Sequence, residues 1–179
     1  MAIKMKEDYI IEPLSKGHDR KSFDCGNDAL NDFFLKRASK DHKSGLSPCF
    51  VITNGNKVLG FITLSMASVE REYFTEDQIR RMSKYPNLPV TLIGKMAIDR
   101  EYQGNGLGKE LLMNAFLRIL KASEDIGTIA IIVDPKDEMA KRFYMKYGFL
   151  PLIDSERLFL PMETIKEAFK MNLTQVPSK

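Results

Sequence analysis

The middle of the chain constrains its fold more than any other segment, because an apolar strand pattern there runs through a glycine-rich turn into an amphipathic helix. The strand pattern extends from Thr91 to Asp99, and the turn reads Gln103-Gly104-Asn105-Gly106-Leu107-Gly108. Beyond the turn, apolar residues recur at helical spacing at Leu107, Leu111, Leu112, Ala115, Ile119 and Leu120. We therefore expect a central strand, a tight turn and a long helix packed on a core.

A glycine turn at the start of a helix is suited to bind a phosphate group. The first N–H groups of a helix have no partner within it, and the helix dipole places partial positive charge there. Gly104, Gly106 and Gly108 remove side chains that would hold a phosphate away and allow left-handed backbone angles, while Leu107 anchors the helix. The glycine spacing fits neither a Walker loop nor a dinucleotide fingerprint. An ordinary helix-entry turn remains the alternative.

The first half of the chain predicts short strands and helices around this unit. Asn27 is a plausible N-cap, and Thr75 with Gln78 has the spacing of a capping box. Asn54-Gly55 predicts the tight turn of a hairpin. The expected elements are a strand from Tyr9 to Leu14, a helix from Asn27 to Lys43, hairpin strands from Ser47 to Thr53 and Val58 to Met66, and a helix to about Lys84. The apolar face Leu30, Phe33, Phe34 and Ala38 is expected in the core, with an exposed groove for a partner as the alternative.

The second half continues the alternation of strands and helices. The near-continuous apolar run from Thr128 to Val133 is typical of a strand covered on both faces. Asp137 can cap a helix through about Tyr147, which Gly148 ends at its C′ position. Further strands are expected near Phe149–Ile153 and Arg157–Leu160, a helix from Met162 to Met171, and a frayed end from Val176 to Lys179. Together these patterns predict one mixed α/β domain over residues 1–179, with helices covering a largely antiparallel sheet.

Composition excludes several classes of protein. The chain has 179 residues, 44% of them hydrophobic, and a net charge of +3, which neither demands nor excludes a nucleic-acid partner. Cys25 and Cys49 make neither a disulfide framework nor, with His18 and His42, a zinc site, so we expect no metal and cytosolic thiols near the core. No apolar run suits a signal peptide or a membrane span. We therefore expect a cytoplasmic protein.

Two motifs together resemble the GNAT family of N-acetyltransferases. The first is the spacing Gln103-x-x-Gly106-x-Gly108, and the second is the segment from Ala140 to Phe149, which carries Phe143-Tyr144 and ends in Gly148-Phe149. The resemblance implies the GNAT fold, in which the strand before the glycine loop carries a bulge and splays from its parallel neighbour. It also implies that acetyl-CoA is the acetyl donor and that an amine attacks it directly.

The resemblance also implies which residues bind acetyl-CoA. The strand segment Met96, Ala97 and Ile98 would line the pantetheine arm, with the backbones of Met96 and Ile98 pairing with it. A backbone N–H near Met96 would polarise the thioester carbonyl. The loop would hold the pyrophosphate through Gln103, Gly104, Asn105, Gly106, Leu107, Gly108 and Lys109.

Tyr144 is the residue that this resemblance assigns to proton transfer. A tyrosine has an ordinary pKa of about 10, so it stays protonated at neutral pH and can protonate the leaving thiolate of CoA. The alternative is that Tyr144 packs against and caps the pocket. No carboxylate stands out as a general base. An α-amine, with an ordinary pKa near 8, needs less help to become neutral than a lysine at about 10.4, which favours an α-amino acceptor.

Further segments resemble the GNAT toxins of bacterial toxin–antitoxin modules: Phe23–Phe34, Leu92–Asp99, Lys136–Ala140 and Leu158–Met162. This resemblance implies that the acceptor is the α-amino group of aminoacyl-tRNA and that a ribbon-helix-helix antitoxin is the partner, with a homodimer possible. Lys95 and the Ser47-Pro48-Cys49 segment depart from the arginines of many relatives. Two basic clusters could contact tRNA phosphates or form ordinary solvated helix faces: Lys36, Lys40 and Lys43, and Arg80, Arg81 and Lys84.

Two other functions remain open from the sequence. One is an acetyltransferase that acts on a small-molecule or protein amine, which would bind without salt-sensitive phosphate contacts. The other is a non-catalytic acetyl-CoA-binding module, which would release no CoA thiol with any amine.

Overall fold

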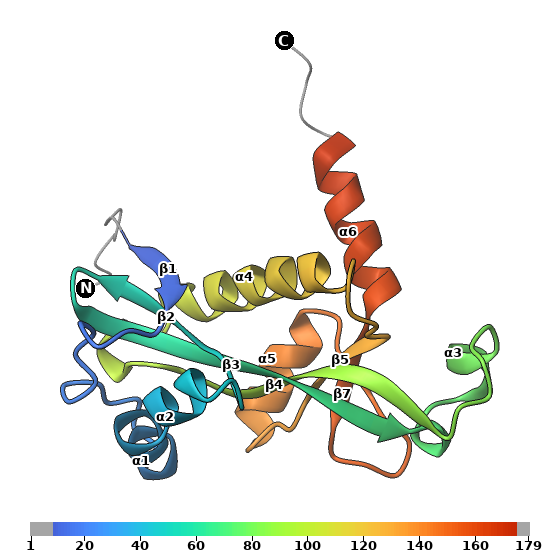
Figure 1. The fold of residues 1–179 in the computed structure, drawn as a ribbon, viewed down its shortest axis with the longest axis horizontal. Coiled ribbons are helices and arrows are strands. Elements are labelled where there is room, and N and C mark those ends of the chain that lie inside the picture. The colour runs from blue at the N-terminus through green and yellow to red at the C-terminus, as the bar shows by residue number, and fades with distance from the viewer. Residues whose placement is uncertain (1–8, 175–179) are drawn as a thin grey trace. The chain divides into compact units, whose positions relative to one another are not determined.

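The computed structural model describes residues 9–174, with side chains described to residue 170. These residues fall into two compact units, the first comprising 9–65 and 94–117 and the second 66–93 and 118–174. Strands β3 (Lys57–Glu70) and β4 (Asn87–Ile98) and helix α4 (Leu107–Ala122) contribute to both units. Figure 1 labels these elements along the chain. The single domain over residues 1–179 stays a prediction.

Among the described residues the strands form a seven-stranded sheet in the order β1-β2-β3-β4-β5-β7-β6. The ladders β1–β2, β2–β3, β5–β7 and β6–β7 are antiparallel, and β4–β5 is parallel. The remaining strands are β1 (Ile10–Pro13), β2 (Cys49–Asn54), β5 (Ala130–Val133), β6 (Leu150–Pro151) and β7 (Leu158–Pro161). The predicted mixed, largely antiparallel sheet with flanking helices is confirmed.

The hairpin of the first unit joins β2 to β3. Asn54 pairs with Lys57, so the turn is centred on Gly55 and Asn56, one residue later than the sequence predicts. Gly55 has a φ of +60°, which suits the first central position of a two-residue hairpin turn. β3 also continues four residues beyond the predicted end at Met66, to Glu70.

The predicted single helix from Asn27 to Lys43 is wrong, because it is divided into α1 (Asp28–Lys36) and α2 (Ala38–Lys43). The start is as predicted, since the side chain of Asn27 accepts the N–H of Leu30. The break has a visible cause. The Arg20 guanidinium donates to the carbonyl oxygens of Phe34 at 3.3 Å and Leu35 at 2.7 Å. In a continuous helix these two oxygens would accept the N–H groups of residues 38 and 39.

The core of the first unit is built on aromatic contacts. Phe34 of α1 stacks on Phe61 of β3 with ring centroids 4.4 Å apart, and Phe23 meets both rings edge-on. Phe33 and Ala38 are buried in the same cluster, and Leu30 packs against it partly buried. The predicted apolar face is therefore core, and it fixes α1 and α2 on β2 and β3.

In the second unit, the predicted helix from Thr75 to about Lys84 is shorter than expected. The capping box of Thr75 and Gln78 is confirmed, but α3 covers Glu76–Ile79 alone. The carbonyl of Ile79 accepts from the N–H of Met82 at 2.9 Å and from the guanidinium of Arg71 at 3.2 Å, which closes the helix with a tight turn. Arg71 itself lies in the 3₁₀ turn η1 (Arg71–Tyr73).

The predicted strand from Phe149 to Ile153 is also shorter, because β6 ends at Pro151. The N–H of Ile153 donates to Tyr73, which takes it out of the ladder. β5 is buried along its whole length, as its apolar run predicts. Helix α5 (Glu138–Lys146) begins after the Asp137 cap, and α6 (Met162–Thr174) extends beyond the predicted Met171. The predicted frayed end from Val176 to Lys179 lies outside the described residues.

The core of the second unit is a separate apolar cluster. Phe159 of β7 meets Phe74 edge-on at 5.2 Å, and Ile79, at the end of α3, packs in the same cluster. Its other buried members are Val69, Leu88, Val90, Ala130, Ile132 and Leu152.

The two free cysteines differ in accessibility, which yields a first prediction. Cys49 is fully buried and its burial raises the pKa of the thiol to about 12, whereas Cys25 is half-buried. A thiolate is the reactive form, so iodoacetamide should alkylate Cys25 of the native protein well before Cys49. Mass spectrometry of time points measures the order, with the unfolded protein as the control in which both react. Equal rates in the native protein would contradict the described packing.

Candidate functional site

The glycine turn lies in the first unit and is open to solvent. It follows the 3₁₀ turn η2 (Arg100–Tyr102) and precedes α4. Gly104 and Gly106 have φ values of +79° and +82°, and a Cβ at either position would meet nothing within 4 Å. These two glycines are therefore required by backbone conformation rather than by crowding.

Gly108 corrects one detail of the sequence-based prediction. It lies within the first turn of α4 and is not among the glycines with a positive φ. Left-handed backbone is thus supplied by Gly104 and Gly106, not by Gly108. Leu107 is 6% exposed and anchors the helix as predicted, while Lys109 is exposed beside it.

The beginning of α4 can bind an anion. The N–H groups of its first turn have no acceptor within the helix, and the dipole of this 16-residue helix adds partial positive charge. Asn105 supports the turn from inside, because its side-chain amide donates to the carbonyl of Tyr102 at 3.2 Å.

The end of β4 presents the second predicted part of the site. Ala97 is buried, whereas Met96 and Ile98 are half-buried. The N–H of Lys95 donates to the side-chain hydroxyl of Thr63 at 3.0 Å. In a regular ladder this N–H would donate to a backbone carbonyl of the neighbouring strand. The Ile98 carbonyl already accepts from the Gln103 side chain at 2.9 Å. β4 is therefore irregular in the segment where the sequence predicts cofactor binding.

The parallel ladder of β4 stops before this segment. Thr91, Leu92 and Ile93 pair with Ile131, Ile132 and Val133, and β4 then continues to Ile98 without a further pair in this ladder. The predicted parallel pair is confirmed, and its splay beyond Ile93 stays a prediction.

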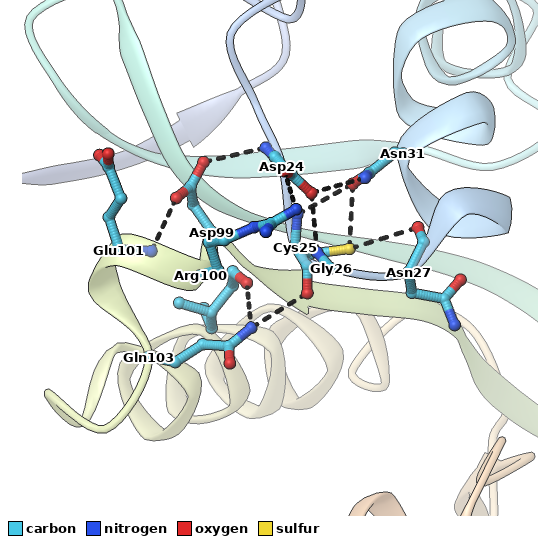
Figure 2. A network of polar contacts seen from close by, with 10 residues as sticks. Asp24, Cys25, Gly26, Asn27, Asn31, Asp99, Arg100, Glu101 and Gln103 are labelled. Atoms are coloured by element: carbon cyan, nitrogen blue, oxygen red, sulfur yellow. Dashed lines mark hydrogen bonds and ion pairs between the residues drawn. The ribbon is translucent and has the colours of Figure 1, made fainter.

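A polar network around Asp99 is a feature that sequence reasoning missed. The Asp99 carboxylate is 4% exposed and accepts the N–H groups of Glu101 and Asp24, each at 3.0 Å (Figure 2). It thereby caps η2 and joins it to the segment before α1. The local signal was an Asp at the end of an apolar strand, two residues before Glu101, which is typical of a cap. The partner 75 residues away has no local signal.

Tyr144 lies in the second unit, on α5. It is 8% exposed and its ring meets Phe143 and Phe149 edge-on, each at 5.3 Å. Burial raises the pKa of the Tyr144 phenol well above its usual range, so it stays protonated at neutral pH. Within the described part of the chain, no group hydrogen bonds to its hydroxyl.

Neither of the two basic clusters is carried by a single helix. Lys36 belongs to α1 and is paired with Asp32, whereas Lys40 and Lys43 belong to α2, because Arg20 divides the helix. Arg80, Arg81 and Lys84 follow the end of α3 at Ile79. All six side chains are exposed, so the charges remain on the surface without the regular spacing that was predicted.

The fold and these features define an α/β protein with an exposed glycine turn at the start of a long helix and a buried tyrosine. Comparison with known proteins identifies its family. The model of the "Acetyltransferase (GNAT) family" matches residues 10–149, and the chain belongs to this family.

Similar proteins are toxins that acetylate tRNA. The tRNA-acetylating toxin of Mycobacterium tuberculosis is 37% identical over 136 residues, which are 76% of this chain and 81% of that protein. AtaT complexed with acetyl-methionyl-tRNAfMet matches with a TM-score of 0.85 and 31% identity, over 90% of this chain and 99% of that one. A tyrosine-to-phenylalanine mutant of AtaT, bound to acetyl-CoA and the C-terminus of the antitoxin AtaR, matches with a TM-score of 0.78 and 30% identity, over 92% and 99%.

The described residues offer neither a metal centre nor a membrane-spanning helix. No group of His, Cys, Asp or Glu side chains in residues 9–170 could hold a metal ion. None of the described helices is both long and apolar enough to pass through a bilayer.

The backbone angles of the glycine turn predict opposite effects of alanine at neighbouring positions. Gly106→Ala should lower the free energy of unfolding by about 1–2 kcal/mol, because an L-residue is strained in the left-handed region. Gly108→Ala should raise it by about 0.5–1 kcal/mol, because alanine is favoured over glycine inside a helix. Urea denaturation of the two variants measures both. An equal loss in the two variants would mean that Gly108 is also conformationally required.

Proposed function

We propose that this protein transfers the acetyl group of acetyl-CoA to the α-amino group of aminoacyl-tRNA and so blocks translation. The observation that carries the proposal is the exposed turn with left-handed Gly104 and Gly106 at the start of α4, in a chain that belongs to an acetyltransferase family. The tRNA acceptor is supported by the tRNA-acetylating toxin of Mycobacterium tuberculosis and by AtaT with acetyl-methionyl-tRNAfMet.

The chain offers suitable groups for each part of acetyl-CoA. The backbone of Gln103, Gly104, Asn105, Gly106 and Leu107, with Gly108 and Lys109, would hold the pyrophosphate through N–H groups and one lysine charge. The β4 residues Met96, Ala97 and Ile98 would line the pantetheine arm.

The transfer needs two proton movements. The amine nitrogen attacks the thioester carbon, the carbon–nitrogen bond forms, and the carbon–sulfur bond breaks with its electron pair on sulfur. A backbone N–H near Met96 would stabilise the negative charge on the carbonyl oxygen. The Tyr144 hydroxyl would protonate the leaving thiolate, the proton lost by the amine goes to solvent, and the tyrosinate regains a proton from solvent. No side chain is assigned as a general base.

Two properties of Tyr144 suit the role of general acid. The ordinary pKa of a tyrosine, about 10, already keeps the proton in place at neutral pH, and burial raises the pKa of Tyr144 further. No group in the described residues hydrogen bonds to the hydroxyl, which leaves it for a bound ligand. An α-amine acceptor agrees with the absence of an assigned base, since its ordinary pKa lies near 8 and part of it is neutral at pH 7.

A regulatory partner follows from the same relatives. AtaT has been solved with the C-terminus of its antitoxin AtaR and acetyl-CoA, and we infer that a small antitoxin, of the ribbon-helix-helix type that the sequence implies, neutralises this protein as well. A homodimer remains a prediction from the sequence resemblance. Charged tRNA and acetyl-CoA as substrates place the reaction in the cytoplasm.

The role of Tyr144 is tested by Tyr144→Phe. This change removes the hydroxyl and keeps the ring packing, so kcat should fall by about 100-fold to 10,000-fold while thermal unfolding stays unchanged. Because burial raises the Tyr144 pKa, the wild-type rate should show no loss from tyrosine ionisation up to about pH 10, the ordinary value of a tyrosine. An unchanged kcat in Tyr144→Phe would mean that the Tyr144 side chain contributes packing and no proton transfer.

The acceptor is tested by measuring CoA-thiol release with different amines. Release should be rapid with charged tRNA and negligible with free amino acids or lysine peptides, and it should slow steeply with salt because tRNA is held through phosphates. Rapid release with a small amine, insensitive to salt, would favour the alternative acetyltransferase. No release with any amine, together with CoA binding, would favour the non-catalytic module.

A further inference from the structure

Residues 24–31 are held to the turn that leads into the glycine loop by hydrogen bonds and an ion pair. The N–H of Arg100 donates to the carbonyl of Asp24 at 2.8 Å, and the Arg100 guanidinium forms an ion pair with the Asp24 carboxylate. In return, the N–H of Asp24 donates to the buried carboxylate of Asp99 at 3.0 Å. Asp24 is therefore held through its N–H, its carbonyl and its side chain, as Figure 2 shows.

Gln103, the first residue of the glycine loop, is held by the same segment. Its side-chain amide donates to the carbonyl of Cys25 at 3.2 Å and to the carbonyl of Ile98 at 2.9 Å. An amide has two N–H donors, and both are engaged by backbone carbonyls. The side chain of Gln103 thus joins the end of β4 to residues 24–31 and has no donor left for a phosphate.

The segment is itself stiff. The Asp24 carboxylate accepts the N–H of Gly26 at 2.9 Å and the side-chain amide of Asn31 at 2.8 Å, and these bonds hold the pKa of the Asp24 carboxyl below its usual range. The Asn31 oxygen accepts the N–H of Cys25 at 2.9 Å and its thiol at 3.1 Å. Asn31 lies on α1, whose Phe34 is buried, so the segment is anchored in the core of the first unit.

We propose that residues 24–31 are a brace that sets the shape of the glycine loop, with Asp24, Asn31 and Gln103 as positioning residues for the pyrophosphate part of acetyl-CoA. The proposal rests on the acetyl-CoA site proposed above. The brace acts through Arg100 and Gln103 on the backbone of the loop. Its side chains take no part in the transfer, so their loss should weaken donor binding and leave the chemical step intact.

The experiment compares two variants that loosen the brace, one within it at Asp24 and one at Gln103, which contacts it, with a matched control. Both are called brace variants below. Asp24→Ala removes the bonds to Gly26, Asn31 and Arg100, and Gln103→Ala removes the two carbonyl contacts. Glu101→Gln is the control, because Glu101 lies in the same η2 turn but its exposed side chain pairs with Lys57 instead. Calorimetry should show CoA binding about tenfold weaker in both brace variants and unchanged in the control.

A truncated donor separates positioning from general damage. S-acetylpantetheine lacks the pyrophosphate, so kcat/KM with this donor should be the same in the wild type and in Asp24→Ala, while kcat/KM with acetyl-CoA falls in Asp24→Ala. Asp24→Asn keeps an oxygen for Gly26 and Asn31 and should recover most of the CoA affinity. If Asp24→Ala does not fold, the CoA affinity of Gln103→Ala tests the brace, because Gln103 is exposed and its substitution disturbs no core packing.

The outcomes distinguish the brace from the proposed function. Unchanged CoA affinity in Gln103→Ala would overturn the brace and leave the acetyltransferase intact. An equal loss with S-acetylpantetheine would also overturn the brace, because the effect would not belong to the pyrophosphate. Failure of the wild-type protein to bind CoA would overturn the proposed function and the brace together.

Discussion

The buried carboxylate of Asp99 is the interaction on which the candidate site depends. A carboxylate that is 4% exposed is costly unless its oxygens are hydrogen-bonded, and here each oxygen accepts one backbone N–H, from Glu101 and from Asp24. The first bond ends β4 and starts the η2 turn at a fixed place. The second attaches the segment before α1. One side chain therefore fixes where the strand stops and where the glycine turn begins.

The glycine turn and Tyr144 lie in different units of the chain. The first unit supplies the glycine turn and the irregular end of β4, which suit the binding of the donor through backbone groups. The second unit supplies Tyr144, which its buried surroundings keep protonated. If backbone N–H groups hold the anionic donor as proposed, surface lysines and arginines are left for an anionic acceptor, and a net charge of +3 is compatible with both.

The sequence predicted the features that depend on local patterns. Asn27, Thr75 and Asp137 cap helices as expected, and Leu107 anchors α4. Errors arose where a distant side chain intervenes: Arg20 divides the helix at Arg37, and Arg71 helps to close α3. The link between Asp24 and Asp99 was missed for the same reason, because its partners are far apart in the sequence. The catalytic assignment of Tyr144 came from family resemblance, since no spacing rule identifies a proton donor.

The central claim is that this chain places an acetyl group on the α-amino group of an amino acid attached to tRNA. Mass spectrometry tests it most directly. Charged tRNA is incubated with the protein and acetyl-CoA and is then digested with ribonuclease. The masses of the aminoacyl-adenosine fragments are measured. We expect fragments that are heavier by one acetyl group, with the acetyl on the amino acid. Fragments of unchanged mass, under conditions in which the protein binds CoA and acetylates another amine, would contradict it.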